Sequence, residues 1–420
     1  MTAATQGIDY TDLYARWERG NWRATEIDFS EDSRQWNTDF SELERRAALW
    51  NYAMFFWGED AVADGLSPYI DAAPREEQKY FLATQQVDEA RHAVFFSRFM
   101  HEVCGIGGDD TSSRLEAIRP ELSWGYRKVF GRLETMCDEL RADPSVPQLA
   151  AGVTLYHVII EATLAQPGQH FITSYLSESD RLPGFRAGME KVAADEQRHI
   201  GFGVKLLSEL VEMDSDARYA VADLLREVIP WTGAVLVPPG WDERYLECFG
   251  MTLEDLGADA VASLETKMRS AGLPVEELPG PPVFPMPGAP RDRAVRGKKL
   301  LKAGYLGEKT GPPSTDPHDM KTLFESVAAG LDSSRAPNGG GVIQWEFADA
   351  EPWHVVVANG STRQERGRVE EPTVTFEARF EDFVDTFAGR RDPRRLLATR
   401  RMRLRGNLLW LWRARDMFPR

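Results

Sequence analysis

A five-residue pattern that could bind metal occurs twice in the chain. Residues 88–92 read DEARH, and residues 195–199 read DEQRH. Each copy contains Glu-x-x-His, and residues three apart on a helix lie one turn apart on the same face. Each copy can therefore offer one carboxylate oxygen and one imidazole nitrogen to a single ion. The repetition predicts two ions, or one site that both copies share.

Two further glutamates stand in apolar helical stretches, each upstream of one copy of the pattern. Glu59 lies in LWNYAMFFWGEDAVADGL, and Glu161 lies in LYHVIIEATLA. A carboxylate is costly to bury unpaired in such surroundings, and a bound metal is a common resolution. The simpler interpretation is that the acids are unrelated buried groups and the two histidines are ordinary ones.

The spacing of the glutamates favours a metal site. The pair Glu59 and Glu89 is centred on Pro74 in a predicted turn, and the pair Glu161 and Glu196 is centred on a predicted loop. Residues equidistant from the turn of a helix hairpin lie at the same height, so each half presents Glu plus Glu-x-x-His at one level. This is the ligand set of a ferritin-like two-metal carboxylate bundle. The predicted ligands are Glu59, Glu89, His92, Glu161, Glu196 and His199.

Length and composition indicate a two-domain protein without membrane spans. The chain has 420 residues, 42% of them apolar, which is more than most single domains need. Its three cysteines include no Cys-x-x-Cys pair, which suits a reducing cytoplasm. The N-terminus has no basic region followed by an apolar stretch, and no uninterrupted apolar run approaches ~20 residues. We therefore expect a cytoplasmic protein with no transmembrane segment.

The charge of the chain is unevenly distributed. A net charge of -16 argues against nucleic-acid binding. Ten arginines nevertheless fall between Arg390 and Arg415. They could form a solvated or inter-domain face whose positive charge complements the acidic first domain. The alternative is a surface that docks an anionic lipid surface, a coenzyme A ester or an acidic carrier protein.

Punctuating residues divide the chain into four parts. Residues 1–40, with three tryptophans and no clear period, are predicted to be an irregular arm. A capping box at Ser41 and Glu44 opens an all-helical bundle over residues 41–272. Seven prolines between Pro274 and Pro290 predict a stiff linker over residues 273–315. Residues 316–420 alternate strand and helix signals.

Within the bundle, five helices are predicted, and Pro167 interrupts the fourth less than two turns after Glu161. The five run from residue 41 to about 69, 74 to 103, 112 to 141, 147 to 176 and 183 to 213, with further helical segments over 215–272. Pro167 cannot donate a hydrogen bond to the carbonyl of Thr163, so either a local kink or bulge beside the metal site or a harmless bend is expected.

The C-terminal part is predicted to be an α+β domain. A helix over 319–331 precedes the strand signals VIQWEFAD, WHVVVANG, TRQERGRV and PTVTFEA, and the end of the chain is helical around a short RMRLRG strand. Asn359-Gly360 predicts a tight hairpin turn. The expected fold is an antiparallel sheet with helices over one face.

The first domain resembles the ferritin-like superfamily, and within it the ligand-binding oxidases related to the ribonucleotide reductase small subunit. The blocks that carry the resemblance are FFWGEDAVADGL, FLATQQVDEARHAVFF, YHVIIEATLAQPG and LPGFRAGMEKVAADEQRHIGFG. The resemblance implies the same six metal ligands, two metal ions per chain as Fe/Fe or Mn/Fe, and oxygen activation beside a bound long-chain fatty acid. Sequence alone does not separate iron from manganese.

The resemblance has further implications at four positions. These oxidases form an ether cross-link between a valine and a tyrosine, which here would be Val62 and Tyr156; both could equally be core residues. Phe96 stands where ribonucleotide reductase small subunits keep a radical tyrosine, which argues against radical storage. Gln169 stands where the oxidases have a tyrosine, so the ligand pocket is expected to differ.

The second domain resembles sterol carrier protein lipid-transfer domains, through IQWEFADAEPWHVVVANG, TVTFEARFEDFVDTFAGRRDP and MRLRGN. That resemblance implies an apolar tunnel for an acyl chain or sterol. The alternative is a packed module for dimerisation or solubility.

Together these features predict an oxygen-activating two-metal oxidase or monooxygenase that acts on a lipid-like substrate bound or presented by the second domain. Asp195 is expected to hydrogen-bond His92 and fix its tautomer. Molecular oxygen and an unknown electron donor are the other expected partners, and the chain is expected to be a homodimer. The competing reading is a non-catalytic lipid-binding or transfer protein whose metal site is structural or cross-links itself. Iron storage fits less well, because a lipid-type domain has no part in a mineral cage.

Overall fold

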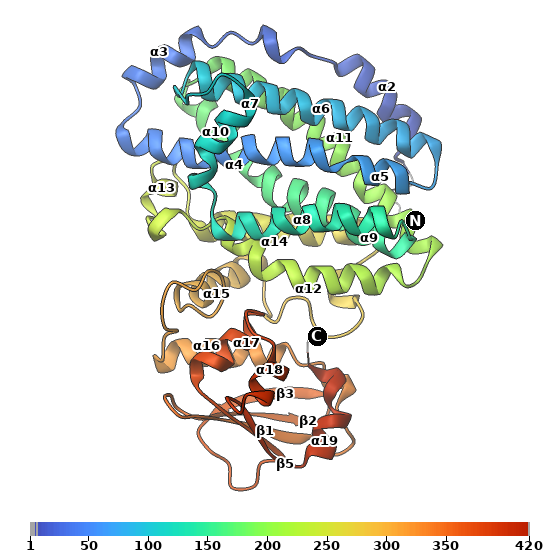
Figure 1. The fold of residues 1–420 in the computed structure, drawn as a ribbon, viewed down its shortest axis with the longest axis vertical. Helices are drawn as coiled ribbons and strands as arrows, with labels where there is room; N and C mark the ends of the chain where they lie inside the picture. Colours follow the sequence, from blue (N-terminus) through green and yellow to red (C-terminus); the bar gives the residue numbers. More distant parts are fainter. Residues whose placement is uncertain (1–4, 6, 419–420) are drawn as a thin grey trace. The chain divides into compact units, whose positions relative to one another are not determined.

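The computed structural model describes residue 5 and residues 7–418, and its contacts divide the chain into two units (Figure 1). The first unit is Met1–Leu224 with Val235–Val275, and the second is Leu225–Ala234 with Glu276–Arg420. Residues 1–4 and 6 of the predicted arm and residues 419–420 of the predicted second domain lie outside the described residues. Helix α12 (Ala217–Val235) is shared between the units, which the sequence does not predict.

Four helical segments of the first unit carry the predicted ligands. They are α4 (Glu42–Gly65), α6 (Glu76–Glu102), α11 (Pro183–Met213), and a continuous run of α9 (Val146–Val153), the π-helix η3 (Thr154–Ala165) and α10 (Gln166–Ser179). The predicted capping box starts α4: Ser41 Oγ accepts from the Glu44 amide at 3.2 Å, and Glu44 Oε2 accepts from the Ser41 amide at 2.7 Å. The all-helical prediction for this domain is confirmed.

Shorter helices complete the first unit. The third predicted helix, 112–141, is instead two helices, because Pro120 closes the first one in a 3-10 turn. The helical segments predicted over 215–272 are interrupted by a 3-10 turn at Pro239–Trp241. These elements are α5 (Ser67–Ala72), α7 (Thr111–Ile118), η2 (Arg119–Glu121), α8 (Trp124–Ala142), η4 (Pro239–Trp241), α13 (Arg244–Glu247) and α14 (Leu253–Ser270).

The predicted irregular arm is wrong over its described residues, because it forms helices. These are α2 (Tyr10–Gly20), the 3-10 turn η1 (Ala24–Glu26) and α3 (Ser30–Thr38). Asp9 caps α2 by accepting from the Thr11 amide at 2.8 Å, and Tyr10 is buried. The buried face of the arm is built from aromatic side chains spread over separate turns, so it has no regular apolar period for sequence analysis to detect.

The backbone before Pro167 forms a π-helix, which is the local widening of the helix considered in the sequence analysis. The Gln166 amide donates to the Glu161 carbonyl, five residues back, and Pro167 follows it with no N–H to donate. The Ala162 carbonyl in this turn accepts instead from Ser263 Oγ at 2.5 Å. Glu161 therefore lies in a widened helix. Gly203 of α11 lets that helix approach closely, since a Cβ at this position would lie 2.2 Å from the Cβ of His157.

The second unit is a five-stranded sheet with helices, as predicted. Its strands are β1 (Gly341–Phe347), β2 (Trp353–Ala358), β3 (Ser361–Arg366), β4 (Val374–Ala378) and β5 (Arg403–Gly406), in the order β3-β2-β1-β4-β5. The β1–β4 pair is parallel, so the predicted antiparallel sheet is wrong at this pair: after β3 the chain returns to the free edge of β1 and adds β4 there in the same direction. The other pairs are antiparallel. Asn359 and Gly360, both at positive φ, form the predicted hairpin turn. The helices are α16 (Pro317–Ala329), α17 (Phe380–Phe387), α18 (Pro393–Ala398) and α19 (Leu408–Arg413).

The structure differs from the predicted linker over its second half. Helix α15 (Pro290–Lys302) begins at the last of the seven prolines, and Leu300 and Tyr305 are buried in the core of the second unit. Up to residue 289 the segment forms a 3-10 turn at Val275–Glu277 and then no helix or strand, but it bends repeatedly, and Leu278 and Val283 are buried. Beyond it, Pro290 occupies the first turn of a helix, a position where proline is favoured.

One helical run in the described chain, Val146–Ser179, is long and apolar enough to cross a bilayer. Within the structure, 83% of its most apolar window is buried. Such burial is typical of a core helix, and this run carries Glu161.

Candidate metal centre

All six predicted ligand side chains come together inside the first unit. Their ligand atoms fall into two groups, and within each group the atoms lie within 4.8 Å of one another. Glu59, Glu89, His92 and Glu196 form one group; Glu89, Glu161 and His199 form the other. Glu89 belongs to both groups, and each of the six residues is at most 6% exposed. The arrangement offers two adjacent positions for ions.

Both histidines point the same ring nitrogen into the centre. His92 Nδ1 lies 3.1 Å from Glu59 Oε2, 3.4 Å from Glu89 Oε2 and 3.5 Å from Glu196 Oε1. His199 Nδ1 lies 3.3 Å from Glu89 Oε1, 3.7 Å from Glu161 Oε1 and 3.8 Å from Glu196 Oε2. Nδ1 is therefore the atom of each imidazole that is placed to ligate.

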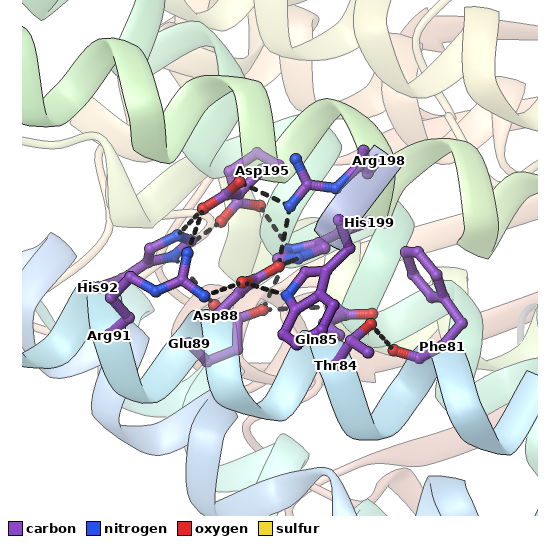
Figure 2. A network of polar contacts seen from close by, with 12 residues as sticks. Phe81, Thr84, Gln85, Asp88, Glu89, Arg91, His92, Asp195, Arg198 and His199 are labelled. Atoms are coloured by element: carbon purple, nitrogen blue, oxygen red, sulfur yellow. Dashed lines mark hydrogen bonds and ion pairs between the residues drawn. The ribbon is translucent and has the colours of Figure 1, made fainter. Parts of the chain in front are cut away.

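The outward nitrogens are held by aspartates from the opposite copy of the repeated pattern (Figure 2). His92 Nε2 lies 3.1 Å from Asp195 Oδ2, the contact expected from the sequence. His199 Nε2 lies 3.1 Å from Asp88 Oδ2, so the two bonds cross between α6 and α11. A carboxylate at Nε2 makes that nitrogen the N–H donor and leaves Nδ1 with its lone pair for a metal.

Two arginines and two tryptophans in turn bind the two aspartates that hold the histidines. Arg91 contacts Asp88 at 2.7 Å and Asp195 at 3.6 Å, and Arg198 contacts Asp195 at 2.6 Å and Asp88 at 3.0 Å. Every position of the repeated Asp-Glu-x-Arg-His pattern except the variable third one is thus used. The arm supplies the remaining donors, because the indole N–H groups of Trp17 and Trp22 donate to Asp88 and Asp195, each at 2.8 Å.

A second set of hydrogen bonds holds the carboxylates on the other side. Gln85 Nε2 donates to Glu161 Oε1 at 2.8 Å and to Glu89 Oε1 at 3.3 Å. Tyr156 Oη donates to Glu89 Oε1 at 2.9 Å. His157 Nε2 lies 3.2 Å from Gln85 Oε1, and burial lowers the pKa of His157 to about 3. A neutral His157 can donate from Nε2 to Gln85 and so orient the amide toward the ligands.

The electrostatics of the centre favour a bound cation. Burial raises the pKa of Glu59 to about 8 and raises the pKa values of Glu161 and Glu196 as well. Burial opposes charge on both histidines, yet the facing carboxylates outweigh it and hold their pKa values well above the ordinary value. Without a cation, the centre keeps protons that a metal would displace.

Unpaired atoms show where such a cation fits. The buried atoms Glu89 Oε2, Glu161 Oε2, Glu196 Oε2 and His199 Nδ1 have no hydrogen-bond partner. Leaving buried polar atoms unpaired is costly, and ions at the two positions would satisfy them. Four carboxylates and two imidazoles suit iron and manganese. The residues present therefore fit two metal ions.

An apolar cavity opens onto the same carboxylates. Its volume is about 90 Å³. Four of the predicted ligands line it: Glu59, Glu89, Glu161 and Glu196. Val62 also lines it, beside the apolar residues Phe55, Phe130, Ile160, Leu164, Leu236 and Leu256. The cavity gives a small apolar group access to the ligand atoms.

Sequence reasoning missed several residues of the centre. Asp88, Arg91 and Arg198 belong to the repeated pattern, so the repeat itself was the available signal. Gln85 and His157 each precede a ligand glutamate by four residues, which places them on its helix face. The arm tryptophans carried no such signal, because their partners are 71 and 173 residues away.

Comparison with known proteins assigns both parts of the chain. The family model for the ribonucleotide reductase small chain matches residues 6–230, just over half of the chain, and the SCP-2 sterol transfer family matches residues 321–413. Solved structures of variants of an R2-like ligand-binding oxidase are similar to the chain. One with an aerobically reconstituted Mn/Fe cofactor is 24% identical with a TM-score of 0.55, and the match covers 63% of this chain and 94% of that one.

A second variant, with an anaerobically reconstituted Mn/Fe cofactor, is 26% identical with a TM-score of 0.54, over the same shares of the two chains. The helices that bring Glu59, Glu89, Glu161 and Glu196 together lie within the matched residues 6–230. The chain therefore belongs to the ribonucleotide reductase small chain family, and it carries a C-terminal SCP-2 sterol transfer domain.

Proposed function

We propose that the protein is an oxygen-dependent oxidoreductase that oxidises a lipid-like substrate at a two-metal carboxylate centre. The observation that carries the proposal is the cavity, because four of the six ligand residues line it together with apolar side chains. An apolar group in that cavity would lie against the ligand atoms themselves. The relatives with Mn/Fe cofactors support an Fe/Fe or Mn/Fe pair held by the six residues.

The chemistry that a bound metal pair would supply is the reductive activation of molecular oxygen. The chain's own residues prepare the place for it. Asp88 and Asp195 keep Nδ1 of each histidine turned inward. Gln85 and Tyr156 hold Glu89 and Glu161 by donated hydrogen bonds. The apolar residues that line the cavity disfavour water beside the ligands, which protects a reactive centre from side reactions.

Phe96 supports oxidation of an external substrate in preference to radical storage. It is fully buried, and its ring lies 5.8 Å from that of Phe55, which lines the cavity. A phenylalanine has no hydroxyl to lose, so it cannot replace the radical tyrosine of the reductases. The SCP-2 domain supports a lipid as the substrate, bound or presented by that domain.

The alternative is a lipid-binding protein whose metal centre is structural or reacts only once, to link Val62 to Tyr156. Val62 lines the cavity, and Tyr156 bonds to Glu89, so both lie at the centre. The electron donor, the cytoplasmic location, the homodimer and an acyl carrier or coenzyme A ester partner stay predictions.

Oxygen consumption by the full chain tests the proposal. The chain loaded with Fe²⁺ and Mn²⁺ is supplied with a chemical reductant and with lipid extracted from the purified protein and identified by mass spectrometry. We expect many oxygen molecules consumed per chain and an oxidised lipid. The variant Glu59→Ala should abolish both, whereas Asp60→Ala, its neighbour outside the ligand groups, should retain them. Consumption that stops after one equivalent, with the lipid unchanged, would favour the alternative.

A further inference from the structure

The C-terminal helix α19 exposes large apolar side chains that the core does not use. Leu408 is 54% exposed, Leu409 is 58% exposed and Trp412 is 61% exposed. The next residue on the other side of the helix, Trp410, is only 8% exposed, and its Nε1 donates to the Gly340 carbonyl at 2.7 Å. Trp410 therefore fixes the helix to the domain while the three exposed residues face away from it.

These exposed residues form one continuous face. At 100° per residue, Leu408, Trp412, Leu409 and Arg413 follow one another over an arc of about 140°. The buried residues Trp410 and Ala414 occupy the opposite arc. Two leucines and a tryptophan side by side on a surface helix are unusual for a chain that meets only water, and they mark an interaction site.

Two arginines lie at this face. Arg413 lies in the helix itself, and the Arg415 guanidinium lies 4.6 Å from the centre of the Trp412 ring; both are exposed. Within the described chain, Arg413 has no carboxylate within ion-pair distance, and Arg415 lies 3.8 Å from its neighbour Asp416.

Three other arginines of this region serve the domain interior. Arg391 and Arg401 pair with the buried Asp382 at 3.1 and 2.6 Å, and Arg390 pairs with the buried Asp385 at 2.9 Å. These three arginines hold α17, which carries both aspartates, whereas Arg413 and Arg415 lie exposed at α19.

We propose that the α19 face, defined as Leu408, Leu409 and Trp412 with Arg413 and Arg415, docks the protein on an anionic lipid bilayer. Apolar side chains flanked by arginines match the two layers of such a surface, since the former enter the acyl boundary while the latter meet the phosphates. Tryptophan is favoured at that depth, because its ring is apolar and its N–H is polar.

Two other occupants, a second copy of the chain and an acidic protein, fit this face less well. A second copy of the chain docked on the same face in a two-fold dimer would bring like-charged arginines together. An acidic protein could meet the arginines, but it would leave two leucines and a tryptophan against polar groups. A bilayer also explains why a lipid-binding domain would carry this face, because a poorly soluble ligand must be taken from a membrane.

Flotation of the full chain with vesicles tests the proposal. Vesicles of phosphatidylcholine alone are compared with vesicles that also contain phosphatidylserine, at low and high salt. We expect binding to the anionic vesicles only, weakened by salt because screening shortens the reach of the arginines. The double variant Leu409→Ser with Trp412→Ser should bind at least tenfold more weakly. Arg413→Gln with Arg415→Gln should lose about fivefold per arginine.

Met213→Ser is the matched control, because Met213 is 57% exposed and lies in the other unit. It should bind vesicles like the unmodified chain, and all variants should keep the same thermal unfolding midpoint, since every changed side chain is exposed. Three results would overturn the proposal. They are no preference for anionic vesicles, equal loss in the control, or a dimer in light scattering that the serine variant abolishes while vesicle binding is absent.

Discussion

Replacing Asp88 with asparagine tests whether the crossed aspartate bonds each support one ion. The two oxygens of Asp88 accept four hydrogen bonds, from Trp17, Arg91, Arg198 and His199, at 2.7 to 3.1 Å. Asparagine keeps one oxygen and turns an NH₂ group toward two of these donors, whichever way it is oriented. The support of His199 is therefore weakened in the Asp88→Asn variant without any change in the ligands.

The expected loss of metal affinity in the Asp88→Asn variant follows from the role of Asp88. Loss of a partner to a metal-bound histidine typically weakens metal affinity by 10–100-fold, about 1.4 to 2.7 kcal/mol. The metal-free fold should also lose stability, by about 3 kcal/mol, since two arginines whose side chains are only 10% and 11% exposed lose part of their pairing. That loss is smaller than two full ion pairs, because Arg91 and Arg198 also contact Asp195.

Each ion can be followed separately in a variant that is expected to bind only that ion. Glu161→Ala should keep only the ion at Glu59, His92 and Glu196, and Glu59→Ala should keep only the ion at His199. Metal retained per chain against graded chelator is then measured by elemental analysis. In the Glu161→Ala background, Asp195→Asn should weaken retention 10–100-fold, whereas Asp88→Asn should change it less than about threefold. In the Glu59→Ala background, the order should reverse.

Glu209→Gln is the control, because this carboxylate bonds to Tyr10 and Gln78 of the same region but contacts no ligand. It should leave metal retention unchanged. The reasoning would be refuted if both aspartate variants affected the same ion equally, or if the Glu209 variant lost metal to the same extent.

Three further predictions concern the same centre. Glu89→Ala should lose both ions while Glu161→Ala loses one, because only Glu89 belongs to both ligand groups; equal metal content in the two variants would contradict this. Aerobic metal loading should join Val62 to Tyr156 and lower the intact mass by two hydrogens, and peptide mass spectrometry showing both peptides unlinked would reject the link. The pKa of Glu59, raised by burial from 4.5 to about 8, means that the folded metal-free chain binds one proton more than the unfolded chain between these values. This group should therefore lower the free energy of unfolding as the pH rises from about 4.5 to 8, and Glu59→Gln should remove that slope in urea titrations with chelator; an unchanged slope would disprove it.

The ligand set could be predicted because its information is local. Glu-x-x-His places two donors on one helix face, and equal distances from a turn align two helices, so His92 and His199 needed no tertiary structure to be found. The same logic extends to Gln85 and His157, one turn before a ligand. The hairpin at Asn359 was predictable for a similar reason, since two residues fix its backbone conformation.

The arm and the linker could not be predicted in this way. Trp17 and Trp22 donate hydrogen bonds to aspartates far along the chain, and no local sequence pattern indicates such a distant partner. Helix α15 is stabilised by burial of Leu300 in the second unit, which sequence analysis did not anticipate after a run of prolines. In both cases tertiary contacts decide the structure, and local propensity is a weak guide to it.

The π-helix at Thr154–Ala165 makes chain length itself a determinant of the metal centre. Its backbone bonds can run five residues back, as at Gln166, so the segment holds more residues than an α-helix with the same number of turns. Deleting one residue there would favour a return to α-helical spacing, which changes the direction of side chains within the segment by up to about 100°, the angle of one residue. Glu161 and Tyr156 could then no longer both face Glu89. Insertions and deletions in these twelve residues should therefore be far less tolerated than point substitutions, and relatives that keep the centre should keep the length of this segment.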